Sequence, residues 1–336
     1  QAAYEALRNN IKGAADASAL QTYYNNGALT DTAVESVDSA VEMVGKGTAL
    51  PEADENGKIV LTQDVVLASR YDLTSGVKEI DLAGHTLSKS TAQSLIKLTG
   101  GSTLTITDSV GTGVIAAADG QAAVVVDGSS TLNLKNVKLT STNNPTIQIQ
   151  VAGGVVDIDG GSITSTSHDA VYIHGENTQA TITIGGGANI TSTTDTAMYL
   201  AGKGDTTIND ATISGAVGVE IRNGVLKVRE GAKIASTNPT FNERGAYGNG
   251  TTVYSGAALV VSPHTVADAA TNVYVTGGTL TGTKQIFLAN YQNNGTGLVD
   301  VDVAGVVVEA SAGTPGAGWA KDANGDWVLT QPAPET

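Results

Sequence analysis

The chain has 336 residues, with 18 basic and 33 acidic side chains, and its formal net charge is −15 at pH 7. A nucleic-acid-binding surface needs clustered Lys and Arg, so this charge argues against a nucleic-acid partner. The sequence contains no Cys, which excludes thiol catalysis, thiolate metal sites and disulfides. It has no apolar stretch long enough to span a bilayer, so we expect a protein that does not cross a membrane.

Residues 1–50 differ from the rest of the chain and indicate a small helical segment. Val34, Val37, Val41 and Val44 are three or four positions apart, which places them in one narrow stripe on a helix. Such a short amphipathic element buries little by itself. We therefore expect residues 1–50 to cap the first coil of the following domain or to dock on a neighbouring molecule.

The next stretch resembles a calcium-binding loop. Glu52, Asp54 and Asn56 place oxygen ligands at alternate positions, with Gly57 for the turn. The stretch departs from the pattern because Gln63 stands where a bidentate Glu is expected. The alternative interpretation is an ordinary Asn-Gly turn before the first strand, and under that interpretation the protein has no cofactor.

From residue 51 to residue 311 the sequence is a repeat. Two apolar–x–apolar tripeptides return in each copy, and the copies are 20 to 28 residues long. Periods of this size are typical of solenoids, in which each coil buries its apolar side against its neighbours. We therefore predict an all-β, parallel β-helix for this domain. The first tripeptides are Ile80-Asp81-Leu82, Leu104-Thr105-Ile106, Leu132-Asn133-Leu134, Val156-Asp157-Ile158, Ile182-Thr183-Ile184, Leu226-Lys227-Val228, Val273-Tyr274-Val275 and Val301-Asp302-Val303.

The run from Ile59 to Ser88, IVLTQDVVLASRYDL…KEIDLAGHTLS, supports this prediction. It resembles the start of right-handed parallel β-helices of pectate-lyase-like shape in bacterial extracellular surface proteins. The resemblance covers residues 58–310. It implies a right-handed solenoid in an extracellular or cell-surface protein of a Gram-positive bacterium. It does not imply an activity, because unrelated functions use this fold.

Enzymes of this shape are polysaccharide lyases and glycoside hydrolases, which need clustered carboxylates. The candidates are Asp157, Asp159, His168, Asp169, His174 and Glu176. The predicted outward column of the first strands has mixed chemistry, which favours solvated polar residues over a catalytic site. The members of that column are Asp81, Thr105, Asn133, Asp157, Thr183, Lys227, Tyr274 and Asp302. We therefore name no catalytic residue and favour a protein that is not an enzyme.

The outward column of the second strands is unusual because five of its eight members are apolar or aromatic. Contiguous exposed apolar surface marks an interface. Three interpretations remain open, namely cover by a segment of the same chain, a neighbouring subunit, or sugar stacking on the two Tyr. The members are Lys97, Val125, Gln148, Tyr172, Tyr199, Glu220, Val260 and Phe287.

The repeat breaks once, between Val228 and Val275. The additional residues 238–255 contain Phe241, Tyr247 and Tyr254, and they indicate a side loop that can contribute to an interface or a glycan site.

Short hydroxyl-rich stretches fall at matching places in the coils. They are Thr140-Ser141-Thr142, Thr164-Ser165-Thr166, Thr191-Ser192-Thr193 and Ala235-Ser236-Thr237. Such a ladder can form a flat ice-binding face or can satisfy the backbone of stacked turns.

The C-terminal residues 312–336 indicate a hairpin followed by a Pro-rich tail. Trp319 and Trp327 flank a turn at Asn324-Gly325, in a stretch that resembles one unit of the repeats in Gram-positive choline-binding proteins. We expect this hairpin to cap the last coil. The final residues, Ala-Pro-Glu-Thr, resemble a sortase product that ends at Thr336, and a Pro-rich linker is the alternative.

These features together predict a structural extracellular protein. It is a surface adhesin or a subunit of a pilus-like filament, which assembles with copies of itself through its terminal segments. A glycan or a host surface is a further candidate partner. The alternative function is a polysaccharide-binding module, a polysaccharide lyase or a glycoside hydrolase.

Overall fold

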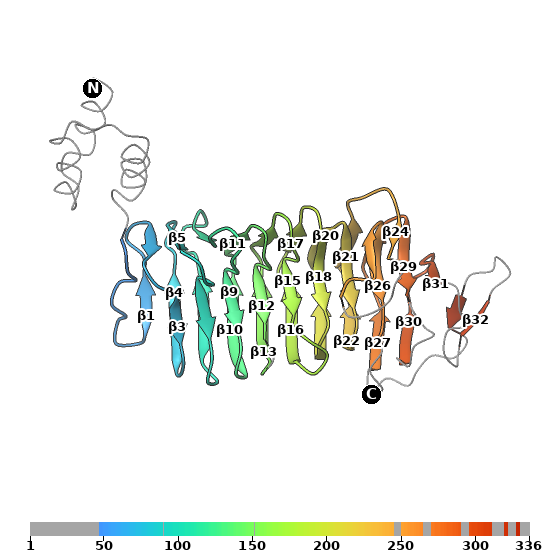
Figure 1. The fold of residues 1–336 in the computed structure, drawn as a ribbon, viewed down its shortest axis with the longest axis horizontal. Helices are drawn as coiled ribbons and strands as arrows, with labels where there is room; N and C mark the ends of the chain where they lie inside the picture. Colours follow the sequence, from blue (N-terminus) through green and yellow to red (C-terminus); the bar gives the residue numbers. More distant parts are fainter. Residues whose placement is uncertain are drawn as a thin grey trace, which may run out of the picture.

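The structure is a computed structural model in which residues 47–89, 91–150, 152–244, 250–264, 270–289, 296–310, 319–321 and 327–329 are described. These residues form an all-β parallel solenoid of about nine coils and contain no helix. Figure 1 shows the coils stacked side by side as a rod. Within the described chain, no helical segment has the length and hydrophobicity of a bilayer-spanning element.

Each coil except the last, among the described residues, contributes one strand to each of three parallel sheets, so neighbours in a sheet come from successive coils. Sheet 1 contains β1 (Lys58–Val60), β4 (Val77–Asp81), β7 (Thr103–Thr107), β10 (Ser130–Lys135), β13 (Gly154–Asp159), β16 (Gln179–Gly185), β19 (Lys203–Ile208), β22 (Gly224–Val228), β27 (Ala270–Val275) and β30 (Thr296–Val301). Sheet 2 contains β2 (Val65–Leu67), β5 (Thr86–Lys89), β8 (Val114–Ala116), β11 (Lys138–Ser141), β14 (Ser162–Ser165), β17 (Ala188–Ser192), β20 (Ala211–Gly215), β23 (Lys233–Ser236) and β28 (Thr279–Thr281). Sheet 3 contains β3 (Tyr71–Leu73), β6 (Ile96–Leu98), β9 (Val124–Val126), β12 (Ile147–Ile149), β15 (Val171–Ile173), β18 (Thr196–Leu200), β21 (Val217–Ile221), β26 (Ala257–Val261), β29 (Lys284–Leu288) and β31 (Val308–Ala310).

The predicted parallel solenoid is confirmed, and its core is a stack of aliphatic columns. In sheet 1 the column runs through Ile106, Leu134 and Ile158, each of which is at most 1% exposed. Alternation along a strand turns every second side chain inward, so each coil adds its apolar residues to the same columns. The right-handed sense of the coil stays a prediction.

The predicted register is wrong by two residues in the first and last copies. Ile80 rather than Leu82 pairs with Ile106, so Glu79 and not Asp81 belongs to the outward column. At the other end, Asp300 and not Asp302 pairs with Tyr274.

The first of these errors arises because Ile80 and Leu82 both point inward and are fully buried. The Asp81 carboxylate instead accepts hydrogen bonds from the backbone N–H groups of Ala83 (3.0 Å) and Ser109 (2.9 Å) at the bend after β4.

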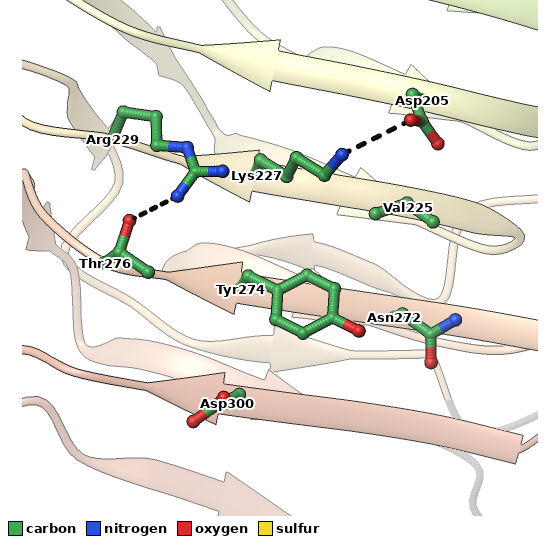
Figure 2. A pocket seen from close by; sticks show the side chains of 8 residues that line it. All are labelled: Asp205, Val225, Lys227, Arg229, Asn272, Tyr274, Thr276 and Asp300. Carbon is green, nitrogen blue, oxygen red and sulfur yellow. Dashed lines mark hydrogen bonds and ion pairs between the residues drawn. The ribbon is translucent and has the colours of Figure 1, made fainter. Parts of the chain in front are cut away.

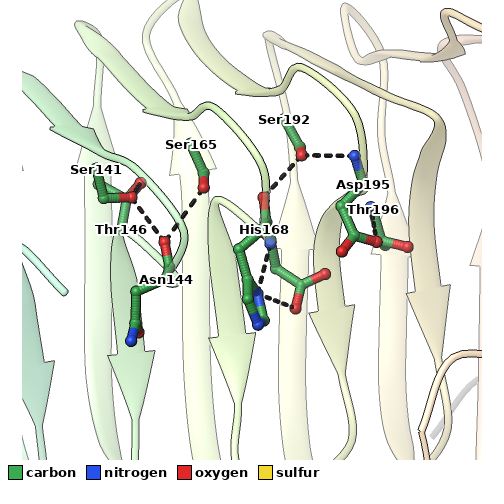
Figure 3. Close-up of polar contacts among 9 residues, drawn as sticks. Ser141, Asn144, Thr146, Ser165, His168, Ser192, Asp195 and Thr196 are labelled. Carbon is green, nitrogen blue, oxygen red and sulfur yellow. Dashed lines mark hydrogen bonds and ion pairs between the residues drawn. The ribbon is translucent and has the colours of Figure 1, made fainter. Parts of the chain in front are cut away.

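A ladder of buried Ser side chains holds the turns between sheets 2 and 3 (Figure 3). Ser141 and Ser165 donate to the Asn144 carbonyl at 2.8 and 3.2 Å. Ser192 donates to the His168 carbonyl at 2.7 Å. In these coils the hydroxyls therefore satisfy stacked turns, which was one of the two interpretations of the hydroxyl-rich stretches.

One Gly turn shows how closely the coils approach. Gly153 adopts a φ of 74°, and a Cβ at this position would lie 1.9 Å from the Gln179 carbonyl oxygen of the next coil. Gly is needed here both for the left-handed backbone and for the space.

The ends of the chain are described only in part. The helical segment predicted within residues 1–50 lies outside the described residues up to position 46, and Thr336 also lies outside them. Near the C-terminus, β32 (Trp319–Lys321) pairs antiparallel with β33 (Trp327–Leu329). Whether these strands cap the last coil stays a prediction.

Candidate functional site

The outward face of sheet 1 is hollowed near the C-terminal end of the rod. The hollow has a volume of about 440 Å³, and Figure 2 shows the side chains that line it. Because they lie on β19, β22, β27 and β30 or directly after them, at alternate positions, they project to the same side. They are Asp205, Val225, Lys227, Arg229, Asn272, Tyr274, Thr276 and Asp300.

Tyr274 occupies the middle of this hollow. It pairs with Lys227 on one side and with Asp300 on the other, and Figure 2 shows its hydroxyl directed towards Asn272. The long excursion after β23 is what brings Tyr274 next to Lys227, because 47 residues separate the two strands in sequence. The hollow therefore presents an aromatic ring surrounded by polar groups.

Both cationic side chains of the hollow have a polar partner within it. Lys227 Nζ lies 3.3 Å from Asp205 Oδ2, and Arg229 Nη1 donates to Thr276 Oγ1 at 2.9 Å. With two cations and two carboxylates among its lining residues, the surface is polar and close to neutral. Such a surface is suited to hydrogen bonding with hydroxyl groups.

The two carboxylates of this hollow lie farther apart than the catalytic pair of a glycoside hydrolase. Asp205 and Asp300 lie on strands separated by three inter-strand steps, which is about 14 Å. Catalytic carboxylates of glycoside hydrolases lie about 5 to 9.5 Å apart. Asp157 and Asp159, two of the candidates considered for catalysis, are exposed on β13. The separation of Asp205 and Asp300 therefore does not match the geometry of a glycoside hydrolase pair.

The side loop forms a small antiparallel hairpin that covers part of sheet 3. It consists of β24 (Asn242–Glu243) and β25 (Val253–Ser255). The Phe241 ring packs edge-to-face on Phe287 with centroids 4.7 Å apart, and Val253 and Val260 are fully buried in the same cluster. The hairpin of the same chain therefore buries Val260 and Phe287, which explains why the outward column is apolar at these two positions.

A buried polar network attaches the hairpin to the solenoid. Glu220 is fully buried and accepts hydrogen bonds from Thr252 N (3.0 Å), Thr252 Oγ1 (2.7 Å) and Ser262 Oγ (2.7 Å). Arg222 is also fully buried, donates to the Ser262 carbonyl at 3.0 Å and contacts the Gly250 carbonyl. Burial raises the pKa of Glu220, while these hydrogen bonds and the Arg222 charge oppose the rise.

Of the remaining outward side chains of sheet 3, some are buried and others are exposed to solvent. Tyr172 and Tyr199 stack with centroids 5.6 Å apart. Tyr172 is partly exposed, whereas Tyr199 is 4% exposed and its hydroxyl accepts a hydrogen bond from Arg222 Nη1 at 3.3 Å. Val125 is buried between its column neighbours. Tyr254 is 51% exposed on β25, and Tyr247 lies outside the described residues.

The structure gives the predicted calcium loop a local role. Asp54 Oδ1 accepts the N–H groups of Asn56 (2.9 Å) and Lys58 (2.8 Å), which fixes the turn that precedes β1. Glu52 is exposed and has no described hydrogen bond to this turn. Calcium binding by Glu52, Asp54 and Asn56 stays a prediction.

Part of the hollow was not found by sequence reasoning. Lys227 and Tyr274 were assigned to one column, but Asp205, Arg229 and Asn272 were not associated with them. Asn272 lies two positions before Tyr274 on β27, and Arg229 lies two positions after Lys227 just beyond β22. Asp205, on the neighbouring strand β19, pairs with Val225. The signal is therefore the outward alternation on either side of the column.

No protein-family model, curated protein or solved structure matches this chain. A function can therefore be proposed only from the geometry of the candidate site.

Proposed function

We propose that the protein is a structural, extracellular adhesin-type solenoid that binds a neutral polysaccharide on the outward face of sheet 1. The observation that carries the proposal is Tyr274, held in the middle of a hollow whose two cationic side chains already have polar partners. Ligand sites combine an apolar or aromatic surface with a few placed polar groups, and this hollow has that composition.

The neutrality of the ligand follows from charge. The chain carries a net charge of −15, which repels anionic polymers at long range. Within the hollow, Asp205 offsets the charge of Lys227, and the whole lining holds two cations and two carboxylates, so the hollow has no excess of positive charge. Sugar hydroxyls accept and donate such bonds, and a pyranose ring can lie on the Tyr274 ring.

Affinity electrophoresis in gels that contain neutral or acidic polysaccharides tests this function. We expect a neutral polymer to retard the native protein and Tyr274→Ala to lose most of the retardation. Tyr254→Ala is the matched control because it removes an exposed Tyr from the hairpin. Retention of binding by Tyr274→Ala would contradict the proposed site.

The same samples are assayed for new reducing ends and for unsaturated uronates, with and without calcium. Release of either product by the native protein would show a hydrolase or a lyase and overturn the binding-only proposal.

Assembly into filaments is the second candidate function, and the ends of the sheets favour it. Within the described residues, β1 and β31 each have a single neighbouring strand in their sheets. Unpaired strand edges invite pairing with another chain. We propose that residues 1–50 and 312–336 mediate this contact, and negative-stain microscopy of the full chain and of a truncation tests it. Normal filaments from the truncation would be incompatible with that role.

A further inference from the structure

Two successive turns between sheets 2 and 3 bring a histidine and two carboxylates together. Ser165 pairs with Ser192 and Val171 pairs with Met198, so the turns between these positions have equal length. His168 and Asp195 therefore occupy equivalent positions in adjacent coils, and Asp169 follows His168 directly. One ligand atom from each of these three side chains lies within 4.8 Å of the other two.

This spacing is close to that of atoms around a single metal ion. Ligands bound to Zn²⁺ at about 2.0 to 2.2 Å lie about 3 to 4 Å from one another in tetrahedral or octahedral arrangements. The three groups can therefore close around one ion with small side-chain movements.

The hydrogen bonding of Asp169 provides a second and independent indication. Its side chain is only 5% exposed, and Oδ1 has no hydrogen-bond partner among the described residues. Its other oxygen, Oδ2, lies 3.1 Å from His168 Nδ1, while that nitrogen accepts the Asp169 N–H at 2.8 Å. Two acceptor atoms thus face each other in a buried position, an arrangement that needs a proton or a cation between them.

The surroundings hold the cluster in place. Ser192 Oγ donates to the His168 carbonyl at 2.7 Å and accepts the Asp195 N–H at 3.0 Å, so one hydroxyl joins both turns (Figure 3). Thr196 N donates to Asp195 Oδ1 at 2.8 Å and orients that carboxylate. The His168 side chain is 40% exposed, which leaves a path from solvent.

We propose that His168, Asp169 and Asp195 bind a divalent first-row transition-metal ion, with Zn²⁺ as the representative. An imidazole ligand favours such ions over Ca²⁺ and Mg²⁺, which prefer oxygen ligands. Three protein ligands leave a coordination position open to water or to a further ligand.

A proton is the competing occupant of the cluster. Burial raises the pKa of Asp169 to about 6, with the Asp195 charge adding to the rise and the contact with His168 opposing it. The close contact with the Asp169 carboxylate raises the pKa of His168. Metal binding and protonation are therefore alternatives that a titration must separate.

Isothermal titration calorimetry of the EDTA-treated, tag-free full chain with ZnCl₂ at pH 7.5 tests the site. We expect one ion per chain, and an affinity at least about tenfold lower in Asp169→Asn, Asp195→Asn and His168→Gln. Asp157→Asn is the matched control, because it removes an exposed carboxylate from sheet 1 and leaves the affinity unchanged.

The affinity for Zn²⁺ should also exceed that for Ca²⁺, and Zn²⁺ should raise the unfolding temperature of the native protein but not of the three variants. Asp195→Asn and His168→Gln alter less buried groups, so they decide the outcome if Asp169→Asn does not fold. Absence of Zn²⁺ binding, equal binding by all variants, or a preference for Ca²⁺ would each overturn the proposal.

Discussion

The buried pair Glu220 and Arg222 allows a quantitative test of how the hairpin is attached to the solenoid. We consider Arg222→Met, which keeps the length of the side chain but removes its charge and its hydrogen bonds to Ser262 and Gly250. Glu220 is then left fully buried without its positive neighbour. The Arg222 charge favours the ionised form of Glu220, and a buried charge that loses its compensating neighbour costs about 3 to 5 kcal/mol.

Hydrogen exchange of the Thr252 amide measures this cost locally, because that N–H donates to Glu220 Oε1. With 1.36 kcal/mol per factor of ten, the expected loss of protection is about 2.2 to 3.7 orders of magnitude. The double variant Glu220→Gln/Arg222→Met should lose less, since it no longer buries a charge. Arg70→Met is the control, because it breaks an ion pair on the surface that is worth about 1 kcal/mol or less.

The effect of Arg222→Met should also depend on pH. The pKa of Glu220 is raised above its ordinary value of 4.5 in the folded protein, and loss of the Arg222 charge raises it further. Between 4.5 and the raised value the folded state holds more protons than the unfolded state, so stability increases as the pH falls. The penalty should therefore shrink from pH 7.5 to pH 5. Unchanged Thr252 protection, or a penalty that grows on acidification, would refute the reasoning.

Two further comparisons test the packing of the coils. Gly153→Ala and Gly187→Ala impose the same left-handed strain, since the φ angles are 74° and 75°, but only at Gly153 does a Cβ meet the next coil. We expect urea unfolding to show a loss of about 1 to 2 kcal/mol for Gly187→Ala and about 1 to 3 kcal/mol more for Gly153→Ala; equal losses would mean that the close approach is unimportant. Ser192→Ala should cost about 1 to 3 kcal/mol and more than Ser165→Ala, because Ser192 serves two backbone groups and Asn144 keeps its bond from Ser141. The reverse order of stability would argue against this assignment of the hydroxyl ladder.

The repeat predicts sheets 1 and 3 well because each of their strands has two inward residues. Alternation of apolar and polar positions then fixes the strand, as in Ile147-Gln148-Ile149 and Val171-Tyr172-Ile173, which are paired in the structure. Sheet 2 was less evident in the repeat, because most of its strands place a single large apolar side chain inward. Ile163 and Ile190 are examples.

The candidate sites were less predictable because they depend on contacts between coils. No motif in the sequence marks Asp195 as a ligand. It lies close to His168 because the register of adjacent coils pairs Ser165 with Ser192. The cover of Phe287 by Phe241 could be named only as one of three interpretations, because the sequence does not show where a side loop folds back.

The direction of the hydrogen bonds between coils has a mechanical consequence. In all three sheets these bonds run along the axis of the rod, so tension applied between its two ends loads the coils in series. A coil such as the one between Thr142 and Thr166 contains 24 residues. A folded coil adds about 4.8 Å to the length of the rod, whereas the same coil spans about 80 Å once it has detached and its chain is extended. A molecule held at both ends would therefore lengthen in steps and dissipate a pull one coil at a time.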